Sequence, residues 1–239
     1  MSPQVFLRSV PGLLLGAACL VAIGAALLAQ TTVPLGWPEG FASRTVPDLP
    51  LEKVLRSGRV EIRVRYPADW VVIQANATVE AERGGRSLIT LGDATGSRFF
   101  TVMEPMDGLG ALDKPLTPAQ FETVVGPVIR GSGPMKVTSS GQVRQGTTGP
   151  LWLWIQSAGL RAEDLGQTAT ASRWPLESVR TWGFFTVMAG HLVNLNCAAM
   201  VWRGEPGAET NDRMARSGIE CGEMVRRLSV QTVRGTPRR

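Results

Sequence analysis

Two cysteines in the last part of the chain are the residues with the most testable chemistry. Cys197 lies in a predicted strand, and Cys221 lies on the apolar face of the helix predicted to follow it. Export would place both in an oxidising compartment, where a disulfide is favoured. The bond would close a loop of about 25 residues and contribute roughly 3 kcal/mol in the chain-entropy model. The alternative is two buried free thiols, because unpaired cysteine is often fully buried.

The chain has one histidine, and the sequence surrounds it with no catalytic pattern. His191 follows Gly190 at a predicted hairpin, which favours an exposed turn position. No Gly-x-Ser-x-Gly or Cys-x-x-Cys sequence is present, so we expect no catalytic residue, no metal and no cofactor. An exported hydrolase or small-ligand-binding protein, the alternative function, would have to use Asp69, Glu163 or His191.

Four residues form the predicted partner-binding surface. The sequence Leu-Trp-Leu-Trp at positions 151–154 places Trp152 and Trp154 on one face of a strand that helices cover on both sides. If the helices leave part of the tryptophan face open, this face is the preferred surface. Asp69 and Trp70 add a second candidate at a sheet edge, although an aspartate in such a turn usually accepts hydrogen bonds from the local backbone.

An uncharged apolar run from Val10 to Ala29 follows Arg8 near the start of the chain. It predicts either a cleaved signal peptide or a retained transmembrane helix, because about 20 apolar residues match the roughly 30 Å hydrocarbon core. Lipoprotein processing at Cys19 fits less well, since glycine stands where leucine is usual. The first two alternatives export everything after residue 30. The predicted location is therefore periplasmic, or anchored in the inner membrane with the domain exported.

The composition divides the chain into four parts. We expect a signal peptide or anchor at 1–29, a proline-rich linker at 30–50, a single α+β domain at 51–230 and a basic tail at 231–239. The net charge of +5 is accounted for by Arg8 and the arginines near the C-terminus. The sequence has no basic stripe interleaved with aromatics, so nucleic-acid binding is excluded.

Alternating and helical patterns predict a sheet with two helices. Thr117, Pro118 and Gln120 form a capping box that begins the first helix, and Pro127 should kink or shorten it. The second helix presents an apolar face made by Met214, Cys221, Met224, Val225 and Leu228. Strands are predicted at 59–66, 70–73, 77–81, 87–91, 98–103, 135–143, 151–155, 181–187 and 192–201.

This order of elements resembles the PsbP-like family, including the DcrB-type bacterial exported proteins, over about residues 60–230. The resemblance rests on a strand ending in Tyr-Pro-Ala-Asp-Trp at 66–70 and a terminal helix running into Arg-Leu-Ser-Val at 227–230. Asp69 stands where the family commonly has glycine, and 160–177 is extra material. The resemblance implies an antiparallel sheet flanked by helices in an α/β/α sandwich. It also implies a non-catalytic accessory protein that binds another envelope protein.

Overall fold

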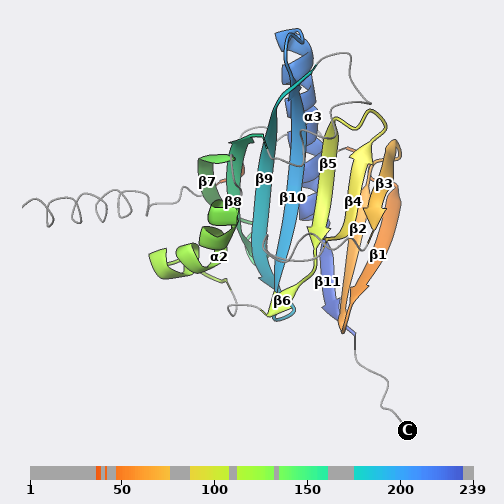
Figure 1. Cartoon of the computed structure of the whole chain (residues 1–239). Helices are drawn as coiled ribbons and strands as arrows, with labels where there is room; N and C mark the ends of the chain where they lie inside the picture. Colours follow the sequence, from red (N-terminus) through yellow and green to blue (C-terminus); the bar gives the residue numbers. More distant parts are fainter. Residues whose placement is uncertain are drawn as a thin grey trace, which may run out of the picture. The chain divides into compact units, whose positions relative to one another are not determined.

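The computed structural model describes residues 36–38, 41, 47–75, 87–107, 112–131, 135–160 and 175–233. Within these residues the chain forms two sheets and two helices, and every strand pair is antiparallel. The predicted α+β class with an antiparallel sheet is confirmed (Figure 1). The helices are α2 (Pro118–Gly131) and α3 (Gly207–Arg226).

The larger sheet has eight strands, and the smaller sheet has three. In the larger sheet the strand order is β3-β4-β5-β10-β9-β8-β7, with β6 paired to β10, and the smaller sheet has the order β1-β2-β11. The strands are β1 (Leu51–Ser57), β2 (Val60–Tyr66), β3 (Trp70–Ala75), β4 (Ser87–Asp93), β5 (Arg98–Met103), β6 (Met106–Asp107), β7 (Lys136–Arg144), β8 (Leu151–Gly159), β9 (Leu176–Met188), β10 (His191–Trp202) and β11 (Ser229–Thr232).

Strands β9 and β10 form the longest hairpin of the large sheet. Its two-residue turn needs positive φ at both positions, and Ala189 has φ 51° and Gly190 φ 80°. The predicted turn at Gly190 is therefore confirmed. His191 is the first residue of β10 and pairs with Met188.

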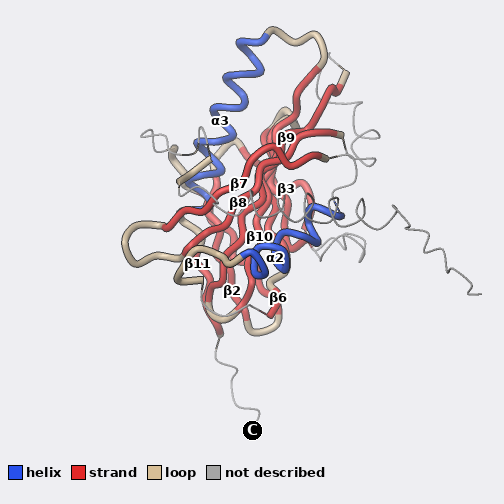
Figure 2. Tube along the Cα trace, turned by 90° about the vertical axis from the view of Figure 1, so that its left-hand side faces the viewer, coloured by secondary structure: helices blue, strands red, loops and turns tan. Residues whose placement is uncertain are grey.

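The main core lies between the large sheet, α3 and the small sheet. From α3 and the residues after it, Cys221, Met224, Val225 and Leu228 enter this core, as their spacing predicted. Figure 2 shows α2 on the side of the large sheet opposite α3. The core side chains from the sheets include Ile62, Val64, Phe100, Trp152, Trp154, Trp182, Phe184, Val193, Leu195 and Cys197.

The segment predicted as a linker contributes to this core. Phe41 is fully buried, with its ring centroid 5.2 Å from that of Trp182 and 5.3 Å from that of Phe184. Leu49 is buried as well. Prolines restrict the backbone here, but burial of one phenylalanine contributes about 1.5–3 kcal/mol. The linker at 30–50 stays a prediction as a whole, but Phe41 and Leu49 within it are part of the core.

Local signals located some boundaries and missed others. The capping box is confirmed, because Gln120 N donates to Thr117 Oγ1 at 3.3 Å and Thr117 N donates to Gln120 Oε1 at 3.0 Å. Pro127 does not end α2, which continues to Gly131. Strand β1 was not predicted because most of its residues are exposed and do not alternate. The strand predicted at 77–81 lies outside the described residues.

Candidate functional site

Strand β3 forms one edge of the large sheet and exposes three consecutive apolar side chains. The exposed fractions are 53% for Val71, 43% for Val72 and 49% for Ile73. Consecutive side chains of a strand point to opposite faces, and the register shifts between Val72 and Gln74 as in a bulge. Apolar side chains are therefore presented on both faces of an edge whose outer backbone groups have no neighbouring strand among the described residues.

The turn before β3 directs its first residue inward. Trp70 N donates to Pro67 O at 3.2 Å, and the Trp70 side chain is only 2% exposed. The guanidinium carbon of Arg98 lies 5.6 Å from the centroid of the Trp70 ring, in cation–π geometry. Trp70 thus joins the beginning of the exposed edge to a buried arginine on β5.

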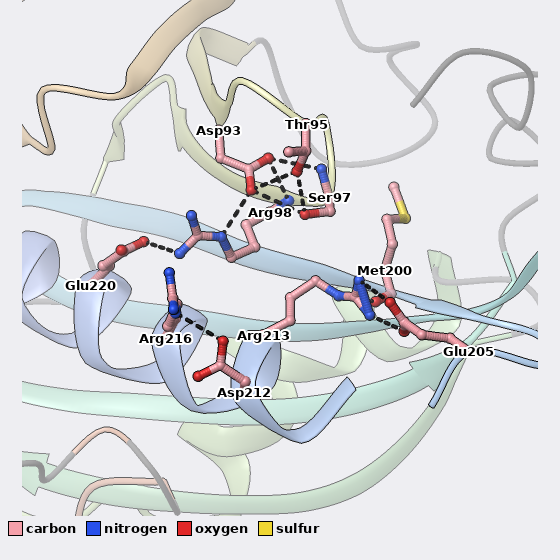
Figure 3. A network of polar contacts seen from close by, with 10 residues as sticks. All are labelled: Asp93, Thr95, Ser97, Arg98, Met200, Glu205, Asp212, Arg213, Arg216 and Glu220. Carbon is pink, nitrogen blue, oxygen red and sulfur yellow. Dashed lines mark hydrogen bonds and ion pairs between the residues drawn. The ribbon is translucent and has the colours of Figure 1, made fainter. Parts of the chain in front are cut away.

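A buried ion cluster surrounds that arginine (Figure 3). Arg98 Nε donates to Asp93 Oδ2 at 2.9 Å, and Arg98 Nη1 donates to Glu220 Oε2 on α3. The Arg98 and Asp93 side chains are 7% and 6% exposed. The cluster therefore connects β4, β5 and α3 through one desolvated cation.

Asp93 also organises the turn between β4 and β5. Its Oδ1 accepts hydrogen bonds from Ser97 N at 2.8 Å and Arg98 N at 3.2 Å. Its Oδ2 accepts from Thr95 Oγ1 and Ser97 Oγ. Such a carboxylate, with five donors on two oxygens, has its charge compensated by short-range contacts despite its burial.

The two carboxyl groups of the cluster have pKa shifts of opposite direction. Burial alone would raise the pKa of Asp93, but hydrogen bonds from Arg98, Ser97 and Thr95 lower it below its ordinary value. Burial raises the pKa of Glu220, and the positive charge and hydrogen bond of Arg98 compensate only part of that effect. Asp93 is therefore the permanent counterion of Arg98, whereas Glu220 is the group that protonates more easily.

A second arginine fixes the beginning of α3 to the end of β10. Arg213 Nη1 donates to Glu205 Oε1 at 2.8 Å, and Arg213 Nε donates to Met200 O at 3.0 Å. By contrast, the ion pair between Arg216 and Asp212 on the same helix is about two-thirds exposed (Figure 3). The contacts of Arg98 and Arg213 attach α3 to the large sheet at two points. Their role is to fix the position of the helix, and they do not orient catalytic side chains.

The predicted tryptophan surface is not available to a partner. Trp152 is 0% and Trp154 is 6% exposed, because both side chains belong to the main core. Trp154 Nε1 donates to Gly36 O at 2.7 Å. On β7, a Cβ at Gly141 would lie 2.5 Å from the Trp154 ring, so the indole packs directly on this glycine. Of the predicted surface, only Asp69 is exposed, at the beginning of β3.

The structure does not bring the predicted hydrolase residues together. Arg98, at the end of the sheet where β3 begins, pairs with Ala199 on β10. His191 lies eight residues earlier on β10, which corresponds to about 26 Å along an extended strand. Asp69 and His191 are therefore at opposite ends of the sheet, and Glu163 lies outside the described residues.

The two cysteines are neighbours in the core and are free thiols in this structure. Burial, together with the adjacent thiol of Cys221, raises the pKa of Cys197 well above its ordinary value. A disulfide between them stays a prediction. Thiol titration of the purified, non-reduced Cys19→Ser chain in denaturant should find the two remaining thiols blocked if the bond forms in its native compartment. Two reactive thiols would contradict the bond.

The Arg98 cluster was not among the sites predicted from the sequence. The signal was the sequence Asp-Ala-Thr-Gly-Ser-Arg at 93–98, which is typical of a turn held by an aspartate. Its partner Glu220 is distant in sequence and could be found only from the packing of α3.

Comparisons with known proteins add a structural likeness and no family. No protein-family model matches the chain, and no curated protein matches it. A solved structure of the protein Mog1, in a point-mutant form, is similar with 12% identity and a TM-score of 0.41. The alignment covers 75% of this chain and 95% of Mog1. At this TM-score the likeness supports no conclusion about function.

These comparisons correct the predicted family. The predicted membership of the PsbP-like family is corrected, because no protein-family model and no curated protein supports it. Among the described residues, no helix is long and apolar enough to cross a membrane. The signal peptide or anchor predicted at 1–29 lies outside those residues. None of the comparisons supports the periplasmic assignment that accompanied the family.

Proposed function

We propose that this chain is a non-catalytic accessory protein that binds another protein, and that edge strand β3 is its binding surface. The observation that carries the proposal is the exposure of Val71, Val72 and Ile73 at an open sheet edge. Monomeric proteins avoid consecutive exposed apolar residues at such a position, because an unprotected edge pairs with other strands.

The other edge of the same sheet provides the contrast. Strand β7 begins with Lys136, and its exposed part continues with Val137, Thr138 and Ser139, so one apolar residue stands among a charge and two hydroxyls. Charged and polar side chains are the usual protection of an edge. Strand β3 has no charged residue between Trp70 and Ala75. The difference between two edges of one sheet supports a binding role for β3.

The occupant that fits this edge is an extended segment of a partner protein with apolar side chains. Its backbone would add a strand beside β3, and its side chains would pack on Val71, Val72 and Ile73. The Trp70 and Arg98 contacts behind the edge hold the beginning of β3 in place before binding. Such pre-organisation lowers the entropic cost of association.

We also propose the finer fold assignment, in which helices flank both faces of the antiparallel sheet in an α/β/α sandwich. Support comes from α3 on one side of the large sheet and α2 on the other (Figure 2). The location of the partner stays a prediction, because the residues that bear on export lie outside the described part of the chain.

The double variant Val71→Lys with Val72→Lys tests the proposal. Both positions are exposed, so the free energy of unfolding should change by no more than about 0.5 kcal/mol per site. A captured partner should bind at least about tenfold more weakly, because two ammonium groups would be desolvated in the interface. The matched control is Val137→Lys on β7, which should leave binding unchanged.

A photo-crosslinking residue placed at position 71 or 137 identifies the contact directly. We expect one crosslinked partner from position 71, lost in competition with unlabelled chain, and none from position 137. Equal capture by both variants would contradict the proposed surface. Crosslinks joining two copies of this chain would also contradict it, because the edge would then mediate self-association.

A further inference from the structure

The outer face of the small sheet carries a cavity that the proposed function does not use. Its volume is about 460 Å³, within the range of small-ligand sites, and it is a shallow depression that is open to solvent. Three strands and the end of α3 contribute to its wall, which is lined by Glu52, Arg63, Arg65, Arg227 and Ser229.

The alternation of β2 explains why charged residues meet there. Ile62 and Val64 point into the core, so Arg63 and Arg65 point outward. The register places Glu52 of β1 opposite Arg65 and Ser229 of β11 opposite Arg63. Arg227 arrives from the C-terminal end of α3, directly before β11. Residues distant in sequence are thus brought to one surface by strand pairing.

Internal ion pairs satisfy only part of the arginine donors. Arg63 forms ion pairs with both Glu52 and Glu61. Arg65 donates through Nε to Glu52, and Arg227 donates through Nε to Glu223. Within the described residues, the Nη atoms of Arg65 and Arg227 have no partner. Two guanidinium groups therefore line the cavity with unused donors.

The local charge is positive after all these pairs are counted. The cavity lining contains three arginines and one glutamate, which leaves a net charge of +2: Arg63, Arg65 and Arg227 with Glu52. An anion that enters the cavity meets the Nη groups of Arg65 and Arg227, which bond to no described residue, and the hydroxyl of Ser229.

We propose that this cavity binds a phosphate monoester dianion. Two charges match the excess of +2, and a monoester presents three oxygens for the donors of Arg65, Arg227 and Ser229. Arginine is suited to this geometry because its paired N–H groups approach two oxygens at once. The same chemistry is offered by a small soluble phosphate ester and by the headgroup of a phosphatidic acid.

Calorimetric titration of the full chain with phenyl phosphate tests the soluble source. We expect saturable binding that strengthens between about pH 5 and pH 7, as the ester gains its second charge. Arg65→Gln and Arg227→Gln should each weaken it by about tenfold or more. The matched control is Arg56→Gln, because Arg56 belongs to the same ion-pair network but does not line the cavity.

Vesicle flotation tests the lipid source. If a lipid supplies the phosphate, vesicles of phosphatidylcholine with phosphatidic acid should bind the unaltered chain. The Arg65→Gln and Arg227→Gln variants should no longer bind to these vesicles. Binding of either phenyl phosphate or these vesicles with that variant pattern supports the proposal. Absence of both, equal loss in Arg56→Gln, or equal binding to vesicles with phosphatidylserine overturns it, because the site would then be absent or unselective.

Discussion

Arg98→Met lowers the free energy of unfolding by about 3–5 kcal/mol, because it leaves Asp93 buried without its cation. Methionine retains most of the apolar stem, so the loss reports the charge rather than a cavity. Glu220 also loses its partner, and Trp70 loses the cation above its ring. Urea denaturation followed by circular dichroism measures the change.

The matched control for this prediction is Arg216→Met on α3. Its ion pair with Asp212 is about two-thirds exposed and should contribute no more than about 1 kcal/mol. Adding Asp93→Asn to Arg98→Met should recover part of the loss, because the unpaired charge is removed. Equal losses at Arg98 and Arg216, or no recovery in the double variant, would show that the cluster is not the buried charge pair described above.

The same cluster has a defined effect on the pH dependence of stability. The folded-state pKa of Asp93 is below its unfolded value, so its contribution is present above the unfolded pKa and is lost as pH falls through the folded pKa. The folded-state pKa of Glu220 is raised, so its contribution is present at low pH and is lost as pH rises through that pKa.

Single variants separate these two contributions. Asp93→Asn should make the free energy of unfolding less dependent on pH in the acid range, although the variant is less stable near neutrality. Glu220→Gln should change the slope in the opposite sense, so that stability falls more steeply on acidification than in the unaltered chain. Urea denaturation across about pH 3 to pH 7 measures both slopes, and the same sign of change in both variants would contradict the assignment.

Local patterns predicted what local forces determine. The capping box at Thr117, the apolar face containing Cys221 and the strand at 98–103 were located from spacing alone and are present. The alternation at 59–66 also placed charged residues on one face of β2. Each of these depends on neighbours within a few residues, which the sequence displays directly.

The candidate sites could not be located in this way, because they depend on contacts between distant segments. Glu220 forms its ion pair with Arg98 only when α3 packs on β5. Arg227 and Arg65 line the same cavity only when β11 pairs with β2. The tryptophans of β8 failed as a binding surface for the same reason, since the segment that covers Trp154 lies more than a hundred residues earlier. The exposed edge at β3 follows from strand order, which hydrophobic patterns do not specify.

Phe41→Ala is the second substitution for which we expect a large loss in the free energy of unfolding. It tests whether the segment before residue 50 belongs to the folded unit. Phe41 is fully buried between Trp182 and Phe184, so truncation should leave a cavity and cost about 3–5 kcal/mol of the free energy of unfolding. A flexible linker residue would cost almost nothing. Urea denaturation and the near-ultraviolet circular dichroism of the neighbouring tryptophan both report the change.

Two controls separate the loss of packing from a general effect of substitution. Phe41→Leu retains apolar volume and should lose clearly less stability than Phe41→Ala. Val54→Ala, at an exposed position of β1, should change the free energy of unfolding by no more than about 0.5 kcal/mol. If Phe41→Ala is as mild as Val54→Ala, the segment is a tether after all. If the large loss is observed, Phe41 belongs to the folded unit.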